Sequence, residues 1–126
     1  MSVEILLVDD SRITRTMQAR MIRMLDLPIS VIHEASDGLE ALVRLDQHPN
    51  VALVVCDLNM PNMDGESFVR ELQRTGREDL DVVILTSDRS VARTEALLDA
   101  GARAYITKPA TPELLRDVLS QLLAAA

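Results

Sequence analysis

The chain has 126 residues, of which 48% are hydrophobic and 26% are charged, as expected for one soluble globular domain with a real core. A net charge of −7 without any basic run argues against nucleic acid or an anionic membrane as a direct partner. No apolar segment approaches the roughly 20 residues that a membrane-spanning helix needs. The single cysteine, Cys56, excludes an internal disulfide and fits a cytoplasmic location, which we expect.

Short apolar runs alternate with longer amphipathic stretches along the whole chain. The runs are rich in Val, Ile and Leu, and two of them, "VALVVC" and "VVIL", are continuous instead of alternating. Continuous runs are typical of strands that are buried on both faces, as in a parallel sheet. The predicted strands are residues 3–8, 29–34, 51–56, 81–86 and 103–107.

The stretches between these runs have helical spacing. In the last stretch, Thr111 is predicted to be the N-cap and Pro112 the first helical residue. Gly76 and Gly101 suit the C-terminal ends of the third and fourth helices. The fourth helix has the least regular pattern. In the first one, apolar residues recur every four positions: Ile13, Met17, Met21 and Leu25.

The chain therefore predicts five successive strand–helix units in a single domain, residues 1–126. Right-handed crossovers place the helices on both faces of a parallel sheet, which makes an α/β fold of three layers, doubly wound around five parallel strands. In such open sheets, ligands bind outside the carboxyl ends of the strands.

Polar side chains follow four of the five predicted strands at this edge. They are Asp9 and Asp10 after the first, Asp57 after the third, Thr86 after the fourth and Lys108 after the fifth. Lys108 is the only lysine of the chain, because the other twelve basic residues are arginines. We expect these five side chains to lie close together.

Three carboxylates in one place repel each other unless a cation joins them, and Mg²⁺ prefers such oxygen ligands. Asp9 and Asp10 alone would fit a helix N-cap equally well, but Asp57 and Lys108 at matching strand ends favour a metal site.

An aspartate can also attack phosphorus and form an acyl phosphate. Phosphoryl transfer needs its oxygen charges neutralised, and a compact lysine ammonium fits a crowded site better than a planar guanidinium. Pro109 fixes the backbone after Lys108, and a cis bond is one way to do so.

Four motifs, "ILLVDDS", "VVCDLNMPNMDG", "VVILTS" and "GARAYITKP", resemble the receiver domain of two-component response regulators. The resemblance covers essentially the whole chain, and "DLNMPNMDG" is most similar to the chemotaxis (CheY-like) regulators. It implies a flavodoxin-like (βα)5 fold with the strand order 2-1-3-4-5. Ser87 departs mildly from the family, in which Ala or Gly is common at this position.

The resemblance also implies a role for each site residue. Asp57 is implied as the phospho-acceptor, and Mg²⁺ as the cofactor, held by the three aspartates and the backbone carbonyl of Asn59. Lys108 is implied to pair with the acceptor or its phosphoryl group. Thr86 is implied to hydrogen-bond the phosphoryl group and move toward it, while Tyr105 swings inward as the aromatic switch.

Partners follow from the same resemblance. A histidine kinase or a histidine phosphotransfer protein is implied as the phosphodonor, acetyl phosphate as a small-molecule donor, and a protein of unknown identity as the downstream target. The domain is not expected to turn over an external substrate, although it catalyses its own phosphorylation and dephosphorylation.

The switching face is the fourth helix, fifth strand and fifth helix, through which many receivers also dimerise. Asn59 and Asp88, each two positions beyond a site residue, are hypothesised to set the lifetime of the phosphorylated state.

Three alternatives remain open at this stage. A flavin- or nucleotide-binding flavodoxin-like protein would want a glycine- or hydroxyl-rich loop after the first strand, where this chain has "VDDSRIT". A phosphatase with an aspartate nucleophile usually carries that residue after its first strand and needs a cap region. A degenerate receiver would bind partners without phosphorylation, against which Asp57, Thr86 and Lys108 argue.

Three further residue types have no role in this chemistry. Phe68 is predicted to lie in the core on the third helix, and Cys56 is predicted to be a buried structural thiol. His33 and His48 lie far from the motifs in the sequence and are assigned no catalytic role.

Overall fold

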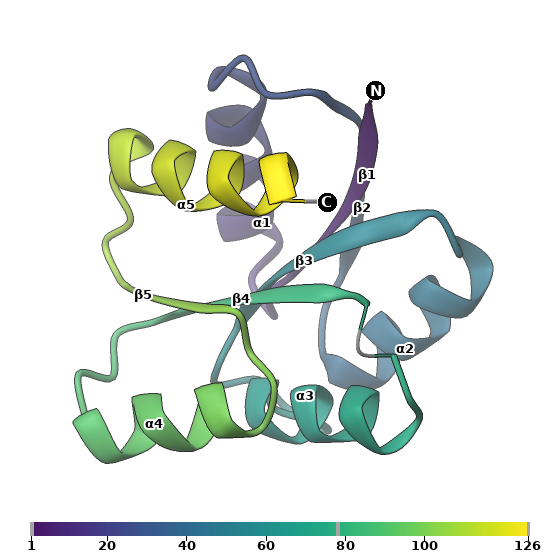
Figure 1. Ribbon diagram of the computed structural model, residues 1–126, viewed down its shortest axis with the longest axis vertical. Helices are drawn as coiled ribbons and strands as arrows, with labels where there is room; N and C mark the ends of the chain where they lie inside the picture. The colour runs from purple at the N-terminus through teal and green to yellow at the C-terminus, as the bar shows by residue number, and fades with distance from the viewer. Residues whose placement is uncertain (1, 78, 126) are drawn as a thin grey trace.

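A five-stranded parallel sheet forms the centre of the computed structural model, which describes residues 2–77 and 79–125 (Figure 1). The strand order is β2-β1-β3-β4-β5, so the predicted doubly wound, flavodoxin-like α/β fold is confirmed. The predicted strand bounds were correct to within one residue. The strands are β1 (Val3–Val8), β2 (Ile29–Ala35), β3 (Val51–Asp57), β4 (Asp81–Thr86) and β5 (Ala104–Thr107).

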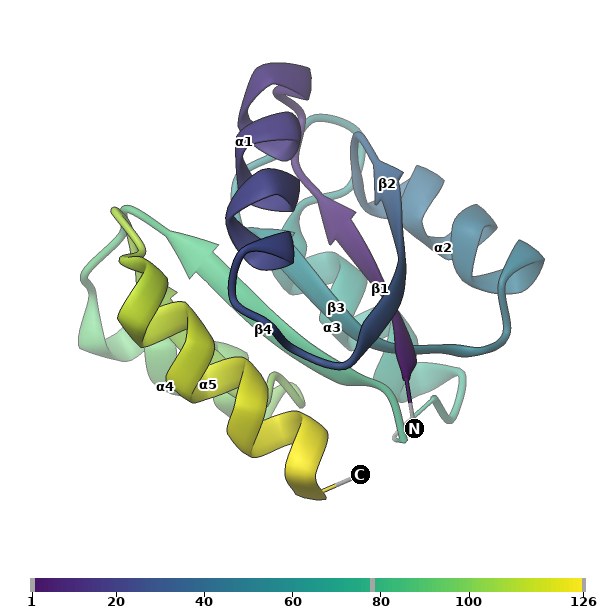
Figure 2. The same cartoon turned by 90° about the horizontal axis from the view of Figure 1, so that it is seen from above.

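Helices cover both faces of the sheet. Figures 1 and 2 show α1 and α5 on one face and α2, α3 and α4 on the other. Among the described residues, no helix combines the length and apolarity needed to cross a membrane. The helices are α1 (Arg12–Arg23), α2 (Gly38–Gln47), α3 (Gly65–Arg74), α4 (Val91–Asp99) and α5 (Pro112–Ala125).

Short polar side chains begin the helices. The predicted cap of α5 is confirmed, because Thr111 Oγ1 accepts a hydrogen bond from the backbone N–H of Leu114. Gly76 and Gly101 follow α3 and α4 with positive φ angles of 78° and 119°, as expected at helix C-termini. The other four helices have the N-caps Ser11, Asp37, Asp64 and Ser90.

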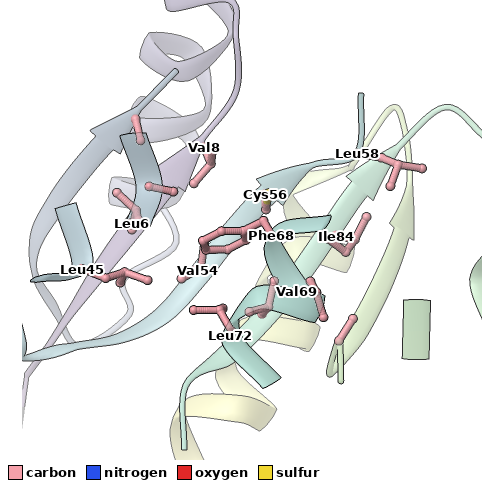
Figure 3. Close-up of a cluster of buried hydrophobic side chains, with 14 of the residues drawn as sticks. Leu6, Val8, Leu45, Val54, Cys56, Leu58, Phe68, Val69, Leu72 and Ile84 are labelled. Carbon is pink, nitrogen blue, oxygen red and sulfur yellow. The ribbon is translucent and has the colours of Figure 1, made fainter. Parts of the chain in front are cut away.

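The core consists of two apolar layers, one on each face of the sheet. Phe68 lies in the layer under α2, α3 and α4, where its side chain is fully buried (Figure 3). Cys56 is also fully buried in this layer, and burial raises the pKa of its thiol. Both predictions for these residues are confirmed.

The apolar pattern of α1 matches its packing only in part. Of the predicted stripe, Ile13 and Met17 are 75% and 64% exposed, Met21 is half-buried, and Leu25, just after the helix, is buried. The reason is that the less exposed face of α1 follows Thr14, Gln18 and Ile22, one position beyond the predicted stripe. The spacing of apolar residues predicts a helix, but it does not say how much of the apolar stripe the neighbouring elements cover.

Candidate functional site

The carboxyl ends of β1 and β3 bring three carboxylates together. Val8 and Cys56 are paired in the sheet, so Asp9 and Asp57 leave neighbouring strands at the same level. Carboxylate oxygens of Asp9, Asp10 and Asp57 all lie within 4.8 Å of one another. We call these three residues the acidic cluster. The sequence predicted their proximity from strand ends alone.

Lys108 places a positive charge beside the acidic cluster. Its Nζ lies 3.3 Å from Oδ1 of Asp57 and 3.7 Å from Oδ2 of Asp9. The ammonium is therefore shared between two carboxylates that would otherwise repel each other. The peptide bond between Lys108 and Pro109 is cis, and the backbone N–H of Lys108 donates to the carbonyl of Thr86.

Asp9 is the buried member of the cluster, with only 2% of its surface exposed. Burial raises the pKa of its carboxyl, and the neighbouring charges of Asp57 and Asp10 raise it further, against a hydrogen bond from the Ser11 N–H and the charge of Lys108. Oδ2 of Asp9 is buried without any hydrogen-bond partner among the described residues. A buried carboxylate oxygen that receives no hydrogen bond, beside two more carboxylates, fits the ligand set of Mg²⁺.

Asp57 has contacts on one oxygen. Its Oδ1 accepts a hydrogen bond of 2.9 Å from the backbone N–H of Leu58 and of 3.3 Å from Lys108. Within residues 2–77 and 79–125 no hydrogen bond to Oδ2 is found, and the side chain is 14% exposed. One oxygen is thus held in place while the second is available for chemistry.

Thr86 and Tyr105 are linked through Asp88. Thr86 is buried, and its Oγ1 accepts a hydrogen bond of 3.1 Å from the Asp88 N–H. The hydroxyl of the half-buried Tyr105 donates to the carbonyl oxygen of the same residue. The two residues that the family resemblance implicates in switching therefore share one backbone segment between β4 and α4.

The two residues hypothesised to set the phosphoryl lifetime occupy different environments. Asn59 is exposed in the loop after Asp57. The Asp88 carboxylate accepts a hydrogen bond from the Ser90 N–H and so stabilises the turn that enters α4. Their proposed role stays a prediction.

Gly65 is a site residue that sequence reasoning missed. It begins α3, and its N–H donates to the carbonyl of Leu58. A Cβ at this position would lie 2.6 Å from the carbonyl oxygen of Asp57 and 3.0 Å from Cα of Leu58. Only glycine lets α3 approach the backbone that carries the acceptor carboxylate.

Gly65→Ala is expected to lower the free energy of unfolding by about 1–3 kcal/mol, because backbone atoms must move to admit the methyl group. Chemical denaturation measures the loss. Ser67→Ala, an exposed position in the same helix, is the matched control and is expected to change stability by less than about 0.5 kcal/mol. Equal stability of the two variants would contradict the close approach.

Asp37 is a second residue that the sequence did not single out. Its Oδ1 caps α2 by accepting from the Glu40 N–H, and its Oδ2 accepts from the side-chain amide of Asn62. These hydrogen bonds, the one from Glu40 first, lower the pKa of the Asp37 carboxyl. The residue ties the start of α2 to the loop between β3 and α3, which follows Asp57.

Asp37→Ala is expected to cost about 1 kcal/mol of stability at neutral pH, as for other lost N-caps. Because the folded-state pKa is lowered, the contribution of the ionised carboxylate is present above the ordinary value near 3.8 and is lost as the pH falls through the folded-state value. Denaturation curves at several pH values check this. Asp37→Asn keeps a capping oxygen, so its deficit relative to wild type should disappear in acid, and a deficit that persists there would contradict the assignment.

The fold and the site define a class of protein: an open parallel α/β domain whose carboxyl edge carries an acidic cluster, a lysine and a threonine. The chain belongs to the response regulator receiver domain family, whose model matches residues 5–120. It is thus a receiver domain of the response regulators of two-component signalling.

Individual relatives agree with this assignment. The response regulator MprA of Mycobacterium ulcerans is 41% identical over 116 residues, which are 91% of this chain and 48% of that protein. The chemotaxis protein CheY1 of Helicobacter pylori is 30% identical over 96% of this chain and 97% of its own length. The chain therefore spans about half the length of some relatives and nearly all of others.

Solved structures show the same fold. The chemotaxis protein CheY4 of Vibrio cholerae superimposes with a TM-score of 0.84 at 26% identity, covering 97% of this chain and 99% of that one. The CheX–CheY–BeF3–Mg²⁺ complex from Borrelia burgdorferi has a TM-score of 0.81 at 25% identity, covering 98% of this chain and 87% of that chain.

Proposed function

We propose that this domain accepts a phosphoryl group on Asp57 and changes its partner-binding face in response. The observation that carries the proposal is the geometry of Asp57, with Oδ1 held by Lys108 and the Leu58 N–H. The donor is a phosphohistidine of a histidine kinase or a histidine phosphotransfer protein. The P–N bond of that group breaks as a P–O bond to the Asp57 carboxylate forms.

The acidic cluster is proposed to hold Mg²⁺ with the backbone carbonyl of Asn59. When bound, the ion neutralises charge on the phosphoryl oxygens. Three side chains are proposed to take part in the transfer itself. Asp57 is the nucleophile, Lys108 neutralises charge beside it, and Thr86 offers its hydroxyl to a phosphoryl oxygen.

The proposed switch follows from the hydrogen bonds around Asp88. If Thr86 turns toward a phosphoryl group on Asp57, its Oγ1 gives up the Asp88 N–H. The same segment holds the Tyr105 hydroxyl, so the two side chains would change position together. Phosphorylation then shifts the population between two conformations of the face formed by α4, β5 and α5. That face binds the downstream target and offers a surface for dimerisation.

Intact mass after incubation with acetyl phosphate and Mg²⁺ tests the proposal, for wild type and for Asp57→Asn. One phosphoryl group is expected on wild type only, and chelation of Mg²⁺ should prevent its addition. Tyr105 is the only tyrosine, so its NMR signal reports the switch directly. No adduct on wild type, with no change of the Tyr105 signal on adding beryllofluoride and Mg²⁺, would favour a phosphorylation-independent binding module.

A further inference from the structure

Two histidines and a glutamate meet at a place remote from the acidic cluster. Nε2 of His33, in β2, lies 2.7 Å from Oε1 of Glu4, in β1. The ring of His48 stacks on the ring of His33, with centroids 3.8 Å apart and an interplanar angle of 22°. One ligand atom from each of the three residues lies within 4.8 Å of the others. We call these residues the histidine cluster.

The fold explains why these residues meet. Glu4 shares a face of β1 with Leu6, and Leu6 is paired with His33 across the sheet, so Glu4 and His33 are diagonal neighbours within reach of each other. His48 directly follows α2, at the position where its N–H donates to the Arg44 carbonyl. Because α2 packs against β2, the residue at its C-terminal end can stack on a side chain of that strand.

We propose that the histidine cluster binds a divalent transition-metal ion of the Zn²⁺ class. Two imidazoles and one carboxylate are a common protein ligand set for such ions, and water completes a tetrahedral shell. With metal–ligand distances of about 2.0–2.1 Å, ligand atoms in that shell lie about 3.3 Å apart. The three ligand atoms now lie within 4.8 Å of one another, and rotation of the side chains brings them to this separation.

The surroundings allow that rotation. All three residues are partly exposed, with 15% of the His33 side chain and 25% of the Glu4 side chain accessible to solvent. The metal opens the ring stack, so that both imidazoles point a nitrogen at it. Arg44, the cation of α2 that precedes His48 by one turn, is engaged by Glu40 and by the carbonyl of Glu34.

The histidine cluster and the acidic cluster lie at different levels of the sheet. Asp9 lies five positions after Glu4, just beyond the end of β1, which corresponds to about 16 Å of strand. The ligand types also differ, because hard Mg²⁺ prefers oxygen whereas imidazole selects the Zn²⁺ class. Each ion can therefore be bound and removed without disturbing the other.

Titration of the untagged protein with Zn²⁺ at saturating Mg²⁺ tests the proposal by calorimetry. Wild type and Asp57→Asn are expected to bind one Zn²⁺ with equal affinity. His48→Gln and Glu4→Gln should each lower the Zn²⁺ affinity by about 10–100-fold or more. A loss of about 10–100-fold is typical when only a hydrogen-bond partner of a metal ligand is removed, so loss of a ligand itself should cost no less. Amide NMR spectra establish that each variant is folded. Full affinity in His48→Gln, or loss of binding in Asp57→Asn, would overturn the proposal.

The two histidines provide a second, independent readout. They are the only ones in the chain, so the imidazole NMR spectrum contains two resolved spin systems. Co²⁺ is expected to shift or broaden both together at one equivalent and to be displaced by Zn²⁺. No change in either ring at that ratio, or a change in only one of them, would contradict a shared site.

Discussion

Phe68→Ala is expected to lower the free energy of unfolding by about 3–5 kcal/mol, the largest stability loss anticipated for a single substitution here. Phe68 is the largest fully buried side chain of the domain and belongs to the apolar layer shown in Figure 3. Its removal loses the favourable free energy of transferring an aromatic ring from water to the core, and it leaves a cavity between α3 and the sheet. Domains of this size are stable by about 5–15 kcal/mol, so much of the margin would be lost.

Urea denaturation followed by circular dichroism measures the effect. Phe68→Leu is the matched control, because it stays apolar and fills most of the space, and it should cost clearly less than Phe68→Ala. A loss below about 1 kcal/mol for Phe68→Ala would mean that the cavity collapses or that α3 does not pack as described.

The sequence was a good guide to features that depend on order along the chain. Short runs rich in apolar residues predicted each strand to within a residue, and the alternation of strands and helices predicted a parallel sheet. Because parallel strands end at one edge, the proximity of Asp9, Asp57 and Lys108 followed without any knowledge of distance.

Features that depend on close contacts between distant segments were not predictable in this way. Gly65 resembles any helix-start glycine until the Asp57 carbonyl is placed beside it. The contact between Asp37 and Asn62 joins two loops, and neither residue type signals its partner. The histidine cluster needs the β1–β2 register and the end of α2 at once, so His33 and His48 appeared unrelated in the sequence.

The contact of Lys108 with two carboxylates suggests why the chain has one lysine among its basic residues. Its ammonium reaches Asp57 and the buried Asp9 at once, from a side chain that is itself 30% exposed. A guanidinium is wider, planar and built for two parallel hydrogen bonds to one carboxylate. At this position it would meet two carboxylates from different strands, and its bulk would compete for the space that a phosphoryl group needs.

Lys108→Met is expected to slow phosphorylation of Asp57 by acetyl phosphate about 100-fold, the usual cost of removing one group that stabilises developing charge. Lys108→Arg keeps the charge but loses the fit, so its rate should lie between those of Lys108→Met and wild type. Rates come from intact mass at saturating Mg²⁺, with Asp57→Asn as the blank. If Lys108→Met reacts as fast as wild type, the ammonium at 3.3 Å from Asp57 neutralises the resting carboxylate only. A Lys108→Arg rate equal to wild type would instead show that charge alone, and not the compact shape of lysine, is what the site requires.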